Sequence, residues 1–239
     1  MTKLCIVVRV WKYMVLMLCL WSSTSWAQGN YRPGDVVPEP YLKVFGHEQF
    51  FKVSTISEPL QALMDDCSMR PNSPITWGDL RYLQVLHRDS DGNAIVGEMV
   101  CNIVIANDLM EIFRALFEAG YPIEQMRLID RYEGDDEASM SDNNTSCFNQ
   151  RPITAGGRIS KHSYGLAIDI NPRYNPYNKV KPSGKSVVKP QESVDYLDRG
   201  ESFPYKIEKG DLCYRLFRQH GFRWGGEWAS GKDYQHFEK

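Results

Sequence analysis

Residues 160–172 read S-K-H-S-Y-G-L-A-I-D-I-N-P and carry the strongest structural signal in the chain. Over residues 165–170, large apolar side chains alternate with small or acidic ones, which is typical of a β-strand with one face on a core. The small residues on the other face leave space beside Asp169. Pro172 ends the strand because it has no N–H group to pair with a neighbouring strand. His162 lies in the loop just before the strand.

A second signal lies at the C-terminal end, where residues 232–238 read K-D-Y-Q-H-F-E. Together with His162 and Asp169, His236 offers two imidazoles and one carboxylate. Catalytic zinc is usually held by three such donors, with a fourth position left for water. Asp233, three residues before His236, would then be a spare carboxylate that acts as general base. Either histidine alone could occur by chance.

The two motifs resemble those of the VanY-like D-alanyl-D-alanine carboxypeptidases and L-alanyl-D-glutamate endopeptidases, zinc peptidases of the hedgehog/DD-peptidase fold. The family pattern is S-x-H-x-x-G-x-A-x-D, followed near the chain end by an acid, two variable residues and a histidine. This chain reads SKHSYGLAID and DYQH, and it matches at Ser160, His162, Gly165, Ala167, Asp169, Asp233 and His236. The likeness extends more loosely over residues 77–239. Many relatives have Glu as the base, so the shorter Asp must lie closer to the metal.

The resemblance implies a Zn²⁺ cofactor bound by His162, Asp169 and His236, and a zinc-bound water that Asp233 activates. It also implies the substrate: peptidoglycan stem peptides, cut next to a D-amino acid. The carboxypeptidase and endopeptidase activities both stay open. A zinc-stabilised module that binds cell-wall peptides without cutting them is the alternative. Asp233 favours the enzyme, since a purely structural site does not need an additional acid.

Peptidases of this family usually bind a substrate carboxylate with an arginine, because a guanidinium can form two parallel hydrogen bonds with it. Arg151, just ahead of the first motif, is the candidate, and Arg131 is the alternative. Both could also be solvated surface charges. Ser160 could bind substrate or fix His162, or it could simply form a turn.

The 239 residues, 42% of them hydrophobic, suffice for one core, and the formal charge of −2 predicts no nucleic-acid partner. Residues 1–27 resemble a secretory signal peptide, with a basic start, an apolar run and small residues before Ala27. A membrane anchor is the alternative, but the apolar run is shorter than the roughly twenty residues that a span requires. We therefore expect cleavage after Ala27, a secreted or periplasmic location, no stable membrane insertion and a monomer.

Four cysteines follow the predicted signal peptide: Cys67, Cys101, Cys147 and Cys213. In an exported protein, an even number of cysteines predicts disulfides, here with three possible pairings. Buried free thiols are the alternative. The cysteines are too scattered for a four-cysteine zinc site.

We predict an α+β fold: a small antiparallel sheet with helices packed on one side and the zinc at the open edge of the sheet. Residues 28–76 would form an N-terminal arm, extended as far as residue 51 and followed by a short helix over 57–64. Residues 77–239 would form the zinc peptidase domain.

Within that domain, residues 79–87 and 94–101 predict a hairpin around the Asp-Gly turn signal, with His87 on the surface at its end. A helix is expected from Asn107 or Asp108 to about Ala119.

Further along the chain, residues 211–220 predict a second helix. Strands are predicted over 125–132 and 233–237, and long polar loops over 135–158 and 173–203, close to the site. Trp224 and Trp228 could line a pocket or belong to the core.

Overall fold

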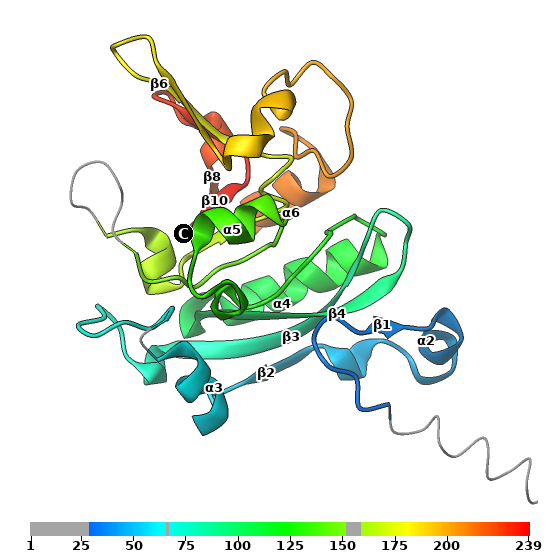
Figure 1. Cartoon of the computed structure of the whole chain (residues 1–239). Helices are drawn as coiled ribbons and strands as arrows, with labels where there is room; N and C mark the ends of the chain where they lie inside the picture. The colour runs from blue at the N-terminus through cyan, green and yellow to red at the C-terminus, as the bar shows by residue number, and fades with distance from the viewer. Residues whose placement is uncertain (1–28, 66, 152–158) are drawn as a thin grey trace, which may run out of the picture. The chain divides into compact units, whose positions relative to one another are not determined.

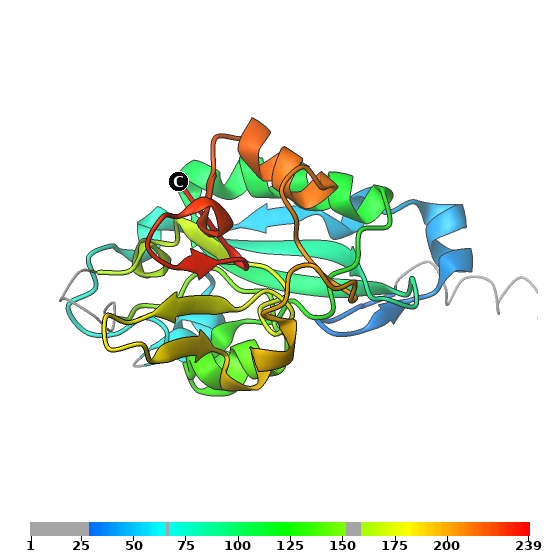
Figure 2. The same ribbon diagram turned by 90° about the horizontal axis from the view of Figure 1, so that it is seen from above.

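The computed structural model describes residues 29–65, 67–151 and 159–239, and Pro33–Lys239 form one compact unit. This unit combines antiparallel sheets with helices, so the predicted α+β class is confirmed (Figures 1 and 2). The predicted signal peptide, residues 1–27, lies outside the described residues. Within the described ranges, no helix has both the length and the apolar composition that crossing a membrane requires.

The largest sheet has four antiparallel strands. Their order is β1 (Val36–Val37), β4 (Ala94–Asn102), β3 (Leu80–Arg88) and β2 (Lys52–Ser54). The predicted hairpin is confirmed as β3 and β4, which pair over their whole length. In the turn, the carboxylate of Asp89 accepts hydrogen bonds from the N–H groups two and four residues later, which stabilises the chain reversal.

One prediction about this hairpin is wrong, because His87 is buried. Its side chain lies under the segment that follows the next helix, where its Nδ1–H donates to the carbonyl oxygen of Ile123 at 2.7 Å. The N–H of Ile123 in turn donates to the carbonyl oxygen of Arg88, which holds the segment around Ile123 over the His87 side chain. Burial lowers the pKa of His87 to about 4, since desolvation disfavours the imidazolium form.

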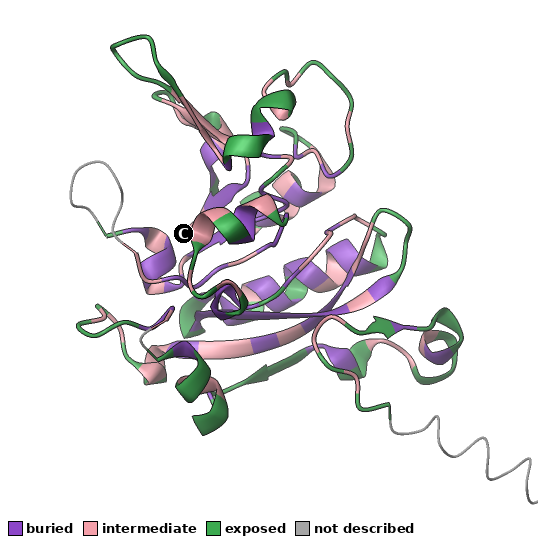
Figure 3. Ribbon diagram, in the orientation of Figure 1, coloured by how far each residue is buried: buried purple, intermediate pink, exposed green. Residues whose placement is uncertain are grey.

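One helix packs on this hairpin, and a second helix packs on the first. Helix α4 (Ile103–Glu118) begins earlier than predicted, because the side chain of Asn102 accepts a hydrogen bond from Val104 N and caps it directly at the end of β4. Its buried residues repeat at helical spacing along one side (Figure 3). Helix α6 (Leu212–Gln219), capped by the side chain of Asp211, matches its prediction and packs on α4.

Two three-stranded sheets carry the C-terminal part of the unit. One has the order β5 (Ala167–Asp169), β10 (His236–Glu238), β8 (Arg223–Trp224). The other has the order β7 (Ser186–Lys189), β6 (Tyr177–Val180), β9 (Lys232–Asp233).

These sheets correct two predictions. The expected strand over 233–237 is divided between β9 and β10, which belong to different sheets. The expected loop over 173–203 contains the β6–β7 hairpin and the 3₁₀ helix η5 (Gln191–Tyr196). As predicted, this segment lies beside the site, since Tyr177 pairs with Asp233.

The strand predicted over 125–132 is wrong. The side chain of Asn144 bonds to both the N–H and the carbonyl of Arg127, so these groups are not available to a neighbouring strand. The chain then turns into a 3₁₀ helix, η3 (Ile129–Tyr132). The polar segment after it was expected to be a loop, yet it begins with helix α5 (Asp136–Ser141), which the carboxylate of Asp135 caps.

The N-terminal segment is more ordered than the extended arm that we expected. It contains β1, α2 (Glu39–Phe45), η1 (Glu48–Phe50) and β2, and its two strands form the edges of the four-stranded sheet. Helix α3 (Glu58–Met64) lies where the short helix was predicted. The 3₁₀ helix η2 (Trp77–Asp79), closed by a capping box, then leads into β3.

The predicted disulfides are wrong. All four cysteines within the described residues are free thiols, and three of them are buried. Burial raises the pKa of each of these three thiols, so they are neutral members of the core: Cys101, Cys147 and Cys213.

Candidate metal centre

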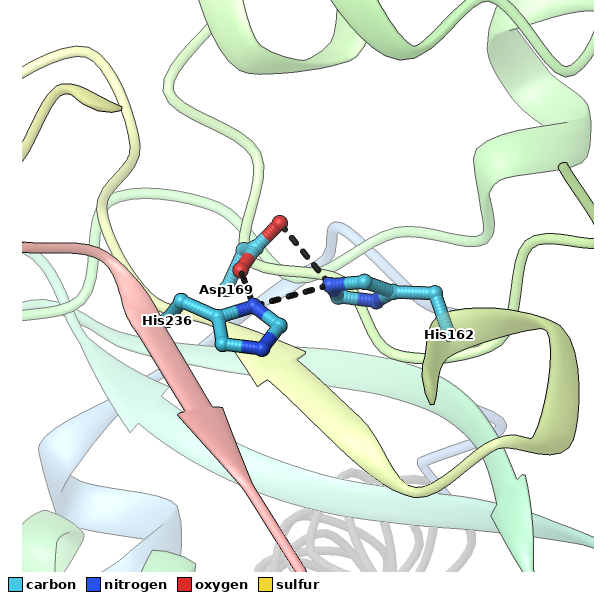
Figure 4. Close-up of side chains that lie close together, drawn as sticks. All are labelled: His162, Asp169 and His236. Carbon is cyan, nitrogen blue, oxygen red and sulfur yellow. Dashed lines mark hydrogen bonds and ion pairs between the residues drawn. The ribbon is translucent and has the colours of Figure 1, made fainter. Parts of the chain in front are cut away.

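Two neighbouring elements and one distant strand bring His162, Asp169 and His236 together in the interior (Figure 4). His162 Nε2 lies 3.2 Å from His236 Nδ1. The two oxygens of Asp169 are divided between the rings: Oδ1 is 2.9 Å from His236 Nδ1, and Oδ2 is 3.1 Å from His162 Nε2. All three side chains are buried. The sequence motifs therefore meet at one point, as the metal-site hypothesis requires.

Strand pairing places the carboxylate beside one of the imidazoles. In the antiparallel pair β5–β10, Asp169 and His236 are direct partners, so their side chains leave the same face of the sheet about 5 Å apart at Cβ. The other edge of Asp169 pairs with Ser146 through two main-chain hydrogen bonds. The backbone of Asp169 is thus held from both sides.

The other imidazole is positioned by the 3₁₀ helix η4 (Lys161–Tyr164). The Ser160 side chain caps this helix and accepts a hydrogen bond from the N–H of His162. Gly165 then ends it in the left-handed region, with φ 63°. A Cβ atom at Gly165 would lie 2.7 Å from the main-chain nitrogen of Asn102, so the motif requires glycine here both for conformation and for close packing on β4.

Hydrogen bonds to the remote ring nitrogens set the protonation of both histidines. His162 Nδ1 lies 2.6 Å from the carbonyl oxygen of Cys147. A carbonyl only accepts, so this nitrogen carries the proton and Nε2 keeps its lone pair for a ligand. His236 Nε2 donates to Glu238 at 3.5 Å, and Arg223 bonds to the same carboxylate at 2.8 Å.

The sequence analysis did not identify these two supporting acceptors. Glu238 could have been found, because side chains two residues apart on a strand share a face with His236. The Cys147 carbonyl had no local signal, since its position depends on how the chain folds.

The spacing of the three donors fits a tetrahedral metal. Zinc–nitrogen bonds of about 2.0–2.1 Å at tetrahedral angles place two ligand atoms about 3.3 Å apart. The observed separations are 3.2, 3.1 and 2.9 Å. The residues present could therefore hold a divalent cation of this size with little rearrangement.

The charges of the three groups are strongly coupled. Burial alone would raise the pKa of Asp169, but the charge of His162 and hydrogen bonds with both imidazoles hold this pKa well below its usual range. Burial would lower the pKa of His236, yet its hydrogen bonds with Asp169 and Glu238 raise it to about 10. The Asp169 carboxylate thus stabilises positive charge on the neighbouring groups. A bound metal ion could provide this positive charge in place of the protons on the imidazoles.

Asp233 lies beside this cluster on β9. Burial raises its pKa to about 7, and the negative charge of Asp169 adds to this effect, whereas His236 and Arg151 oppose it. Its Oδ1 is buried and has no hydrogen-bond partner among the described residues. A buried carboxylate oxygen without a hydrogen-bond partner destabilises the folded state, unless a bound ligand or a proton satisfies it.

The two candidate arginines lie in different places. Arg151 forms an ion pair with Asp136 at 3.0 Å, and its Nη2 is 4.0 Å from Oδ2 of Asp169. Arg131 instead lies near Glu98, at 3.8 Å, in a separate cavity. The structure therefore brings Arg151, and not Arg131, to the cluster.

The two tryptophans also differ. Trp224 is buried and stacks on Phe237, so it belongs to the core, and it also lines a cavity together with Arg199 and Tyr234. The half-buried ring of Trp228 lies 5.3 Å from the ring of His236, which makes it a wall of the site.

Two imidazoles and one carboxylate, with a second carboxylate alongside, form the type of site found in metal-dependent hydrolases. Residues 154–239 match the model of a protein family described as D-alanyl-D-alanine carboxypeptidase. This match confirms the resemblance seen in the two motifs, and it covers only the C-terminal part of the chain. No curated protein and no solved structure was found that matches the chain.

Proposed function

We propose that the protein is a zinc-dependent peptidase that hydrolyses peptidoglycan stem peptides next to a D-amino acid. The family match supports carboxypeptidase-like chemistry on D-alanyl-D-alanine. The observation that carries the metal dependence is the convergence of three buried donors at separations of 2.9 to 3.2 Å. Hydrolysis by a D,D-carboxypeptidase or by an endopeptidase would use the same centre.

In this proposal His162, Asp169 and His236 hold the zinc ion. When bound, zinc would supply an acidified water and polarise the scissile carbonyl group. The hydrogen bond from His162 Nδ1 to the Cys147 carbonyl keeps the opposite nitrogen free to bind the ion. Glu238 has the corresponding role for His236.

Asp233 would act as the general base. Its buried Oδ1, which has no partner among the described residues, is available to accept a proton from the attacking water and to pass it to the departing amine. A dication nearby would favour the ionised form of this carboxylate and offset the effect of burial.

Arg151 would bind a substrate carboxylate. Asp136 orients one end of its guanidinium at 3.0 Å, and its Nε is buried without a partner among the described residues. These N–H groups could therefore form the paired hydrogen bonds that a carboxylate accepts. The Ser160 side chain accepts a hydrogen bond from the N–H of His162, which supports a role for Ser160 in positioning this metal ligand.

The proposed location is the periplasm or the cell exterior. It rests on the signal-like sequence of residues 1–27, with cleavage after Ala27. Cell-wall peptides would then be accessible, and the mature chain would act as a monomer without membrane insertion and without a nucleic-acid partner.

The test combines metal analysis with mass spectrometry of peptidoglycan fragments incubated with the purified protein. We expect about one zinc per chain and the loss of a terminal D-amino acid or a cut within the stem. Asp233→Asn should keep zinc but lower the rate by about 10²- to 10⁴-fold, because the base is lost. Asp91→Asn, in the exposed hairpin turn, is the matched control and should remain active.

Two results would count against the enzyme. Zinc retention without any hydrolysis by the unmodified protein would favour a binding module. Purified protein that never retains a divalent metal would remove the basis of the proposal.

A further inference from the structure

A second cavity, of about 370 Å³, lies between α3, β2, β3 and η3, and none of the candidate metal ligands lines it. The cavity has apolar side chains on one part of its lining and the oppositely charged Glu98 and Arg131 on another. Its lining includes Leu60, Leu63, Leu128, Tyr82, Glu98 and Arg131. The sequence analysis had considered Arg131 for substrate binding, but the structure places it here.

Glu98 is the unusual member of this cavity. Its side chain is only 5% exposed. Its Oε2 accepts a hydrogen bond from the hydroxyl of Tyr82 at 3.0 Å. Its Oε1 is buried and makes no well-aligned hydrogen bond among the described residues, although the main-chain N–H of Leu128 faces this carboxylate. A desolvated carboxylate oxygen is stabilised when a cationic donor fills this position.

Arg131 supplies the opposite charge at the cavity mouth. Its Nε lies 3.8 Å from Oε1 of Glu98, too far for a hydrogen bond, and its side chain is 55% exposed. The guanidinium thus keeps most of its donors free for a ligand. Glu98 and Arg131 both line this cavity.

The rest of the cavity is suited to a small aliphatic group. Leu128 is buried, Leu60 is half-buried and Leu63 is 37% exposed. These side chains offer an apolar surface directly beside the charged pair. Apolar walls with a few convergent polar groups are the usual composition of a small-molecule site.

We propose that this cavity binds a free aliphatic α-amino acid as its zwitterion. The ammonium group would bond to the Glu98 carboxylate, the ligand carboxylate would bond to Arg131, and the side chain would contact the leucines. Because Glu98 and Arg131 together are neutral, a neutral ligand with two opposite charges on one carbon leaves no charge uncompensated. A ligand with only a negative charge would bond to Arg131 and leave the buried Glu98 carboxylate without a new partner, which is costly. This site is independent of the chemistry at the metal centre.

Isothermal titration calorimetry on the purified protein tests the ligand class. The probes are L-alanine, D-alanine, L-valine and L-leucine, which compare chirality and side-chain size. We expect saturable one-to-one binding of at least one of them. N-acetyl-valine lacks the ammonium group and valinamide lacks the carboxylate. Each should bind about tenfold or more weakly than valine, because a buried polar partner stays unpaired.

Variants assign the binding to the cavity. Glu98→Gln keeps the shape of the side chain, and Arg131→Ala removes a half-exposed one, so both should fold. Each should weaken binding about tenfold or more. Glu111→Gln, at an exposed position of α4, is the matched control and should bind like the unmodified protein.

Two outcomes overturn the proposal. One is the absence of saturable binding by all four amino acids. The other is binding that both cavity variants retain. If such binding is lost in His236→Ala, the ligand occupies the metal centre and not this cavity.

Discussion

The contact between Gly225 and Asp233 allows the proposed base to be displaced without touching a metal ligand. A Cβ atom at Gly225 would lie 2.6 Å from the carbonyl oxygen of Asp233 and 2.7 Å from its Cβ. Ordinary contacts of a Cβ atom begin at 3.4 Å, so the two segments would have to separate by about 0.8 Å. In Gly225→Ala, the carboxylate of Asp233 should therefore shift relative to the cluster.

A displacement of this size has a predictable kinetic effect. Misplacing a catalytic group by about 1 Å can cost about a hundredfold in rate, so we expect kcat/KM to fall about 10- to 100-fold. Zinc content should stay near that of the unmodified protein, because the three candidate ligands belong to η4, β5 and β10. The variant thus separates positioning of the base from metal binding.

The assay measures release of D-alanine from a stem peptide that ends in D-alanyl-D-alanine, together with zinc per chain. Gly78→Ala is the matched control, because its Cβ would meet only the Thr76 hydroxyl oxygen at 3.5 Å. An unchanged kcat/KM in Gly225→Ala would show that the position of Asp233 does not limit the rate. An equal fall in the control would show that the loss is not specific to this contact.

Three further predictions concern the imidazoles and the thiols. The pKa of buried His87 is about 4 in the folded protein, whereas the ordinary value is 6.5. As the pH falls, His87 is therefore protonated in the unfolded chain before it is protonated in the folded one. The free energy of unfolding should therefore drop by about 3 kcal/mol between pH 6.5 and pH 4. Urea unfolding across this range should show the drop, and His87→Gln should reduce it. Glu238→Gln should weaken zinc binding about 10- to 100-fold in a chelator competition, because it removes the carboxylate that orients His236; equal affinity would contradict that role. All four described cysteines should react with an alkylating agent after denaturation without reductant, and reductant should leave the melting temperature unchanged. A protected pair would contradict this.

Elements with strong local signals could be predicted from the sequence. The β3–β4 hairpin has an Asp-Gly turn signal between two strand-like segments, and α6 has its own cap at Asp211. These signals lie within the elements themselves. The prediction was wrong where a distant residue decides the structure: Asn144 occupies the main-chain groups of Arg127 and so prevents the strand expected over 125–132.

The smallest elements could not be predicted for a related reason. Strands β8 and β9 have two residues each, too few to show any alternation. They exist because neighbouring strands supply their hydrogen bonds. The cysteines show the same limit, since an even count says nothing about whether any two thiols lie within bonding distance.

For the candidate site, the sequence alone determined which chemical groups are available: two imidazoles, a carboxylate beside a small-residue strand, and a second acid three residues before the last histidine. Only the tertiary structure decided that these groups meet, through the register that opposes Asp169 and His236, and that Arg151 joins them while Arg131 lines another cavity. The physical reason is that donor chemistry belongs to each side chain, whereas the distance between donors depends on strand pairing and packing between segments far apart in the chain.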